Sequence, residues 1–108
     1  MPNRQSRISQ EQYAQNIPVT KTASCTIKSY ESVVEVDSSA GVAIALVMPH
    51  PAECIGCFIT VYVTAFSGGI TLTAATSQDF AAVTLNGVDD GVCLFSDGKR
   101  WWSFDART

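Results

Sequence analysis

The sequence predicts an all-β protein: a small antiparallel β-sandwich or barrel, jelly-roll-like in outline, with an extended N-terminal arm. Three observations favour this fold. From about residue 22 the apolar residues recur with a period of two, as in half-buried strands. Turn residues separate about seven or eight such short segments. No long helix is needed after residue 20. With 108 residues, 46% of them hydrophobic, the chain suits one domain with a core.

The arm is predicted over residues 1–21 and the β-sandwich domain over residues 22–108. Ser9-Gln10-Glu11-Gln12 can open one short helix with Ser9 as its N-cap, and Pro18 would end it. Such a polar arm is either a frayed terminus or a strap that orders on a partner. It lacks the apolar region of a signal peptide, so we expect synthesis and folding in a cytoplasm. The longest apolar run, residues 40–48, is too short to span a bilayer.

The first three predicted strands span residues 23–30, 32–36 and 41–47. The first alternates only loosely between apolar and polar residues, and a turn at Asp37-Ser38-Ser39 follows the second. The third strand is apolar on both faces, which is typical of a central strand. Pro49-His50-Pro51 ends it, because proline cannot donate to a ladder of hydrogen bonds.

Residues 57–65 alternate most clearly. One face would carry Cys57, Ile59, Val61, Val63 and Ala65, and the other Phe58, Thr60, Tyr62 and Thr64. Shorter strands are predicted at residues 70–73 and 82–85, with a loop at Thr76-Ser77-Gln78-Asp79 between them. Each ends next to turn-forming residues.

The last two strands, residues 91–95 and 100–104, are predicted to form a hairpin across Asp97-Gly98. This dipeptide tolerates the positive φ angles that a type I′ turn requires. Neighbouring strand residues point to opposite faces, so one of Trp101 and Trp102 must face the core and the other must face away. The outward ring needs a partner: a cross-strand neighbour, another subunit or a sugar.

Charge is sparse and uneven along the chain. The net charge of −3 argues against electrostatic binding to nucleic acid. No lysine or arginine lies between Lys28 and Lys99, whereas that interval holds eight acidic residues. A strand-rich region this poor in charge leaves sheet edges and apolar patches unprotected. The chain is therefore either a mildly acidic soluble domain or a protomer that covers its flanks in an oligomer.

The motif Cys54-Ile55-Gly56-Cys57 has the spacing of a metal-binding or redox pair. Cys25 and Cys93 bring the total to four cysteines. A zinc ribbon shows two close pairs, however, and a redox pair needs a strand-to-helix context. We therefore expect buried free thiols and no bound metal. Cys54 and Cys57 are the weak candidates for metal ligands.

No other motif predicts catalysis. His50 is the one histidine, and no Gly-x-Ser-x-Gly motif accompanies it. Asp89-Asp90 lacks the spaced oxygen ligands of a calcium loop and reads as a turn. Phosphate-binding and dinucleotide motifs are absent. The sequence predicts a protein that is not an enzyme and uses no cofactor.

Three segments resemble β-rich structural proteins of tailed bacteriophages. They are Gly69-Ile-Thr-Leu-Thr73, Ala82-Val-Thr-Leu85 and Gly91-Val-Cys-Leu-Phe-Ser-Asp-Gly-Lys-Arg-Trp101. These phage modules carry a strand like "ITL" and then "VxLxSDGxxW" near the C-terminus. The resemblance covers roughly residues 57–104, and its sharpest motif is Ser96-Asp97-Gly98 with Trp101. The second tryptophan and the four cysteines depart from the pattern.

The resemblance implies a virion structural protein on the capsid exterior. It would be a head decoration (cement) protein that binds the major capsid protein as a homotrimer, with no nucleic-acid or membrane partner. Two alternatives stay open: a tail or fibre module that binds host glycan, and a metal-binding β domain built on the close cysteine pair. The predicted capsid or subunit contacts are Arg4, Arg7, Tyr13, Ile17, Trp101 and Trp102.

Overall fold

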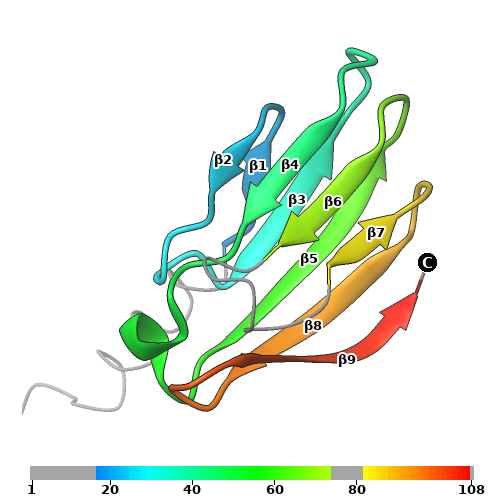
Figure 1. Cartoon of the computed structure of the whole chain (residues 1–108). Coiled ribbons are helices and arrows are strands. Elements are labelled where there is room, and N and C mark those ends of the chain that lie inside the picture. Colours follow the sequence, from blue (N-terminus) through cyan, green and yellow to red (C-terminus); the bar gives the residue numbers. More distant parts are fainter. Residues whose placement is uncertain (1–16, 74–81, 108) are drawn as a thin grey trace, which may run out of the picture.

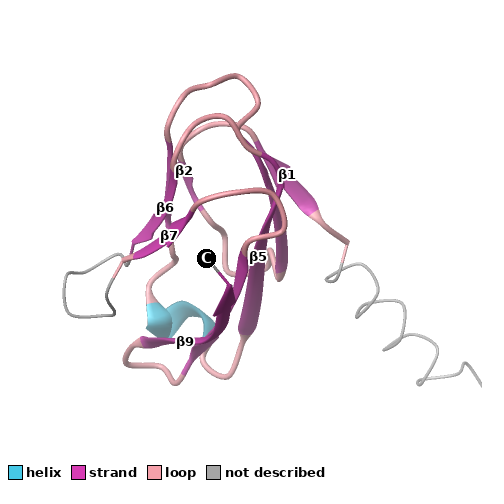
Figure 2. Ribbon diagram, turned by 90° about the vertical axis from the view of Figure 1, so that its right-hand side faces the viewer, coloured by secondary structure: helices cyan, strands magenta, loops and turns pink. Residues whose placement is uncertain are grey.

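The computed structural model describes residues 17–73 and 82–107, whose strands form two facing sheets (Figure 1). Figure 2 shows the sheets edge-on, with β2, β6 and β7 in one layer and β1, β5 and β9 in the other. The predicted helix at residues 9–12 and the predicted loop at residues 76–79 lie outside the described residues. The strands are β1 (Val19–Lys21), β2 (Cys25–Thr26), β3 (Val33–Asp37), β4 (Ile44–Val47), β5 (Phe58–Ala65), β6 (Ile70–Thr73), β7 (Val83–Leu85), β8 (Gly91–Ser96) and β9 (Trp101–Arg107).

The first six strands alternate between the two sheets. One sheet has the order β1-β3-β5-β8-β9 and the other the order β2-β4-β6-β7. The chain therefore crosses to the opposite sheet after each of the strands β1 to β5. Each pair of strands, one from either sheet, forms a winding, and successive windings lie side by side. Of the strands in the described ranges, only β6–β7 and β8–β9 follow each other in sequence and also pair within one sheet. Each sheet ends in two edge strands and does not close on itself.

The all-β class is confirmed, but the expected antiparallel pairing is wrong for much of the molecule. Four strand pairs are parallel, from β1–β3 to β4–β6. The other three are antiparallel. Short strands separated by turns can either fold back within one sheet or cross to the opposite sheet. Alternation along the sequence is the same in both cases, so it did not distinguish them.

Two of the early strand predictions need correction. The strand expected over residues 23–30 is reduced to Cys25–Thr26, and Tyr30 beyond it is 71% exposed. The third predicted strand forms as Ile44–Val47 and is an inner strand of its sheet, as expected. Its outer face is not covered, however, because Ala45 is exposed. Val19–Lys21, which the sequence assigned to the arm, forms the edge strand β1.

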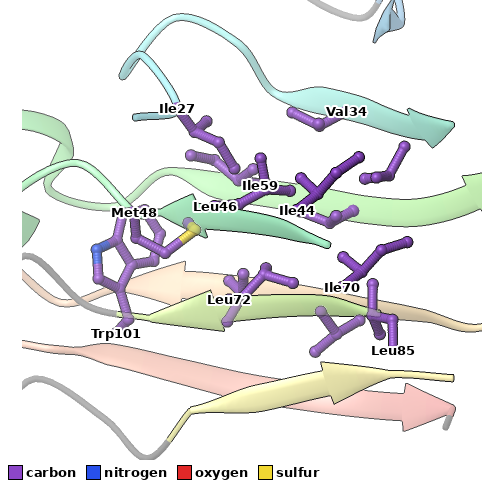
Figure 3. Packing of buried hydrophobic residues seen from close by; sticks show 14 of the residues in the cluster. Ile27, Val34, Ile44, Leu46, Met48, Ile59, Ile70, Leu72, Leu85 and Trp101 are labelled. Carbon is purple, nitrogen blue, oxygen red and sulfur yellow. The ribbon is translucent and has the colours of Figure 1, made fainter. Parts of the chain in front are cut away.

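The core lies between the sheets and comes from alternate residues of both (Figure 3). The predicted inward face of residues 57–65 is confirmed at Ile59, Val61 and Val63, which are at most 1% exposed. Register aligns the apolar residues of neighbouring strands into rows. Examples are Val34 opposite Val61 and Ile44 opposite Ile70. The buried apolar set is Ile27, Val34, Val36, Ile44, Leu46, Met48, Cys54, Ile59, Val61, Val63, Ile70, Leu72, Leu85, Val92, Leu94 and Trp101.

The β3–β4 and β5–β6 turns, which both carry the chain between the sheets, lie side by side at one end (Figure 1). Ser38, at the end of β3, is 1% exposed, and its hydroxyl donates to the carbonyl of Gly68 at 2.8 Å. The same hydroxyl accepts the amide hydrogens of Ser67 and Gly68. One buried side chain thus ties the β3–β4 turn to the β5–β6 turn.

The β8–β9 hairpin is confirmed, but the predicted type I′ turn is wrong. Ser96 pairs with Trp101, so the loop has four residues. Of the four loop residues, only Gly98 has a positive φ, of 95°. Asp97 instead folds the loop through its side chain, which accepts the amide hydrogens of Lys99 at 2.8 Å and Arg100 at 2.9 Å. This carboxylate supplies the local bonds that the shorter turn would have made with its backbone.

Candidate binding surface

Four of the aromatic residues on the outer face of the five-stranded sheet are neighbours, and we call them the aromatic face: Phe58 on β5, Phe95 on β8, and Trp102 and Phe104 on β9. Phe58 is paired with Phe95, and Phe95 with Trp102. The ring centroids of Phe58 and Phe95 are 4.8 Å apart, and those of Phe95 and Phe104 are 6.5 Å apart. These spacings are typical of interacting aromatic pairs.

The aromatic face is exposed because its strands send their other residues into the core. Phe58, Trp102 and Phe104 are 55%, 43% and 44% exposed. Their inward-facing neighbours Ile59 and Trp101 are fully buried. An open depression in the face is lined by Phe58, Cys93, Phe95, Ser103 and Phe104. None of these lining residues carries a charge.

The two adjacent tryptophans point in opposite directions, as the sequence predicted. Trp101 is fully buried, and its indole N–H donates to the carbonyl of Pro49 at 2.8 Å. The indole N–H of Trp102 donates to Asp97 at 2.9 Å, in an exposed position. The guanidinium of Arg100 lies 4.2 Å from the centre of the Trp102 ring. Two residues of the same hairpin, Asp97 and Arg100, therefore hold the Trp102 ring in place. The ring is still 43% exposed.

Asp97 stands at the hairpin end of the aromatic face as a carboxylate. The hydrogen bond from Trp102 and then the amides of Lys99 and Arg100 lower its pKa from 3.8 to about 2. Each of these donors stabilises the charged form. The carboxyl group of Asp97 is therefore ionised at neutral pH, and Lys99 and Arg100 lie next to it in the loop.

Glu35 lies on the same outer face of the sheet, on β3, which is the strand next to β5 on the side away from β8 and β9. It accepts hydrogen bonds from the hydroxyl of Tyr62 at 3.1 Å and from the hydroxyl of Thr20 at 3.3 Å. Burial, and then the bond to Glu35, raise the pKa of Tyr62. Strand register places Glu35, Tyr62, Gly91 and Arg107 in one row across the sheet.

The close cysteine pair lies before β5 and not on the aromatic face: Cys54 ends the short helical turn Pro51–Cys54, and Cys57 precedes Phe58. Cys54 is 4% exposed, and Cys57 is half-buried against the core. Burial, and then the neighbouring thiol of Cys57 and the carboxylate of Glu53, raise the pKa of Cys54 to about 11. A thiol with this pKa is a poor nucleophile and gives up its proton to a metal reluctantly.

The structure does not bring further metal ligands to the close cysteine pair. Among the described residues no three His, Cys, Asp or Glu side chains form a group that could hold a metal ion. Cys25 on β2 and Cys93 on β8 lie in different sheets, and all four cysteines are free thiols. The ring nitrogen Nδ1 of His50 accepts the amide hydrogen of Ala52 at 3.1 Å and caps the short helical turn Pro51–Cys54.

The acidic pair Asp89-Asp90, which the sequence analysis considered as a calcium loop, is a turn, as the sequence predicted. Asp89 has a positive φ of 73°, and Asp90 accepts the amide hydrogen of Asn86 at 2.7 Å. This turn precedes β8, whereas Trp102 pairs near the far end of β8. The acidic residue beside the exposed tryptophan is therefore Asp97, from the hairpin itself.

The predicted contact residues fall into three groups. Arg4, Arg7 and Tyr13 lie outside the described residues. Ile17 is 49% exposed and precedes β1. Of the tryptophan pair, Trp102 is exposed and Trp101 belongs to the core.

Sequence reasoning did not identify Phe58, Phe95 and Phe104 as candidate contact residues. The alternation of residues 57–65 already placed Phe58 on the face opposite the core. The sequence signal that could have identified these contact residues is the presence of large aromatic residues at outward-facing strand positions.

No protein-family model matches the chain, and neither a curated protein nor a solved structure matches it. Within residues 17–73 and 82–107, no helix is long and apolar enough to cross a membrane.

Proposed function

We propose that this protein is a virion structural protein that decorates the exterior of a phage capsid as a homotrimer and stabilises the shell. The observation that carries the proposal is the aromatic face, an exposed and uncharged surface built on three strands. Apolar patches of this kind mark sites of protein contact. As part of the proposal, the two sheets serve as a small sandwich-like scaffold that keeps the surface rigid.

Such a protein works through binding energy alone. Each trimer contacts more than one shell subunit, so its binding opposes their separation by mass action. Several weak contacts made together also give a much higher avidity than one contact. Aromatic residues suit this role, because they bury a large area with few rotatable bonds.

The first experiment asks where the chain is found. Virions of the phage that carries this sequence would be purified, and heads and tails would be separated and analysed by quantitative mass spectrometry. The proposal expects the chain in the head fraction, in a fixed ratio to the major capsid protein. Its absence from virions, or its presence in tails alone, would contradict a decoration role.

The exposed rings favour one second candidate, a tail or fibre module that binds host glycan. Sugars stack on exposed aromatic rings, and Phe58, Trp102 and Phe104 are all accessible. Tail localisation together with binding to host-surface polysaccharide would support this candidate. Decoration predicts neither result.

A further inference from the structure

The close cysteine pair, Cys54 and Cys57, lies at the two ends of one tight turn. The backbone N–H of Cys57 donates to the carbonyl of Cys54 at 3.0 Å. Between them, Ile55 has a φ of −58° and a ψ of 128°, and Gly56 has a φ of 79°. These angles match a type II β-turn, whose first and fourth Cα atoms lie within about 7 Å of each other. A disulfide joins Cα atoms that are roughly 4.4–6.8 Å apart. The backbone therefore holds the two cysteines about as far apart as the ends of a disulfide.

The side chains of this turn converge on the core between the sheets. Cys54 is 4% exposed and belongs to the buried core, and Cys57 packs against that core. The two thiols also interact with each other. After burial itself, the charge and the hydrogen bonding of the Cys57 thiol raise the pKa of Cys54. Cysteines whose side chains diverge cannot be bridged without movement of the backbone, and this pair does not diverge.

The turn is fixed to the β8–β9 hairpin through Ser96, the last residue of β8. The N–H of Gly56 donates to the carbonyl of Ser96 at 2.8 Å, and the N–H of Ser96 donates to the carbonyl of Cys57 at 3.1 Å. The buried hydroxyl of Ser96 donates to the carbonyl of Pro51 at 2.7 Å. Because these bonds already hold the turn in the folded protein, a disulfide across it would mainly restrict the unfolded chain.

The buried thiol suits a structural disulfide and not a catalytic one. Proteins that oxidise other thiols have a reduced form that is stabilised, through a cysteine of low pKa. Burial instead raises the pKa of Cys54 to about 11. A disulfide carries no charge, so an apolar interior does not penalise it. The pair should therefore oxidise slowly, because its thiolate is scarce, and then stay oxidised.

We propose that Cys54 and Cys57 form a disulfide when the protein meets a small-molecule disulfide such as oxidised glutathione. Half-buried Cys57 reacts first. Its thiolate attacks one sulfur of the reagent, and the other sulfur leaves as a thiolate that takes up a proton. Cys54 then gives up its proton and attacks the sulfur of Cys57, which forms the bridge and releases the second glutathione. Two protein thiols are oxidised, and one glutathione disulfide is reduced to two thiols.

This inference goes beyond the proposed function and does not depend on it, because it concerns the turn before β5 and not the aromatic face. Disulfides form and persist in oxidising environments outside the cytoplasm. A protein that leaves a reducing cytoplasm would meet the oxidant at that step. The bridge would then close the turn that Ser96 ties to the β8–β9 hairpin.

The first test measures the bridge in the full wild-type chain, folded and in concentrated urea. Each sample is equilibrated with mixtures of reduced and oxidised glutathione, and its free thiols are blocked with a maleimide. Cleavage after Glu53 and after Phe58 releases residues 54–58 as one peptide, without Cys25 or Cys93, for mass spectrometry. We expect the equilibrium constant for the bridge to be at least about tenfold larger in the folded protein, because the turn holds the thiols together. A folded protein that favours the bridge no more than the unfolded chain does would overturn the proposal.

Single variants test the order of the two steps. Cys54→Ala should keep glutathione attached at Cys57, because no second thiol can release it. Cys57→Ala should trap at least about tenfold less glutathione on Cys54, since that thiol is buried and protonated. Alanine keeps both positions apolar, and circular dichroism shows whether each variant is folded. Equal trapping in the two variants would contradict attack through Cys57.

The double variant Cys25→Ala with Cys93→Ala is the matched control. These two thiols lie in different sheets, and their removal leaves the close pair intact. The double variant should form the bridge with the same equilibrium constant as wild type. Loss of the bridge in this folded variant would show that oxidation passes through Cys25 or Cys93, and the close pair would no longer be the site.

Discussion

Two adjacent tryptophans have different energetic roles in this protein. Trp101 fills the core and satisfies the carbonyl of Pro49, whereas Trp102 packs on the surface against Phe95 and Arg100. A buried side chain contributes its full transfer free energy, and its loss leaves a cavity and an unpaired polar atom. An exposed ring stacked under a guanidinium contributes much less.

Equivalent substitutions at the two tryptophans should therefore differ in cost. We expect Trp101→Phe to lower the free energy of unfolding by about 2–4 kcal/mol, from the unsatisfied carbonyl of Pro49 and the lost volume. Trp102→Phe should cost less than about 1 kcal/mol. Urea denaturation followed by circular dichroism measures both. Equal costs would show that Trp102 is as important to the fold as Trp101.

Asp97 gives the hairpin a pH dependence with a defined sign. Its pKa in the folded protein is about 2, below the ordinary value of 3.8. The unfolded state therefore binds the proton more readily, and acid favours unfolding. The contribution of Asp97 to stability is complete above 3.8 and is lost as the pH falls through about 2.

We expect Asp97→Asn to flatten the acid limb of the stability curve. The variant keeps a side-chain oxygen that can accept the loop amides but cannot titrate. Thermal unfolding recorded between about pH 5 and pH 2 should show a smaller loss of stability for the variant than for wild type. Parallel curves for the two proteins would mean that another carboxylate dominates this range.

At the scale of elements, the turns between sheets decide how the windings stack. Gly68 lies where the β5–β6 turn passes the β3–β4 turn. A Cβ atom on Gly68 would come within 2.3 Å of the backbone carbonyl oxygen of Val42. Nothing lies within 4 Å of the corresponding position on Gly69. The backbones of the two turns thus approach each other too closely for a side chain at Gly68, whereas Gly69 has space for one.

This difference predicts opposite tolerance at neighbouring positions. Gly68→Ala should destabilise the protein by about 1–3 kcal/mol or more, because backbone must shift to relieve the contact. Gly69→Ala should be close to neutral. The midpoint of urea unfolding for each variant measures the effect. A destabilised Gly69→Ala would show that its backbone conformation, and not space, is the constraint.

At the scale of the whole molecule, one face of the five-stranded sheet carries a group of exposed aromatic side chains. Cys93 lines the depression in that face and is partly exposed, so it reports whether the face is covered. Cys54 reports the interior, because burial keeps its thiol protonated, with a pKa of about 11.

We expect alkylation of Cys93 to slow as protein concentration rises through the self-association range. Phe104→Ser should remove this concentration dependence. Alkylation of Cys54 at neutral pH should be slow at every concentration. Site-resolved mass spectrometry after timed iodoacetamide treatment gives each rate. A Cys93 rate that does not change with concentration would mean that this face stays open in the oligomer.

Part of the candidate surface could be predicted from the sequence. Alternation predicted that Phe58 faces away from the core and that one tryptophan is exposed. It did not predict that Phe58 meets Phe95, because β5 is far from the β8–β9 hairpin in the chain. Nor did it show that Asp97 holds Trp102, since that bond depends on a four-residue loop where a two-residue turn was expected.

The sequence by itself determined the all-β class and the location of most strands, because alternation and turn residues are local properties of the chain. The positions of β5, β6, β7 and β8 follow from them within about a residue or two. Only the tertiary structure decided which strands are neighbours and therefore which pairs are parallel. The reason is physical: alternation records that one side of a strand is buried, and the core between the sheets buries that side in the same way whichever sheet the strand joins.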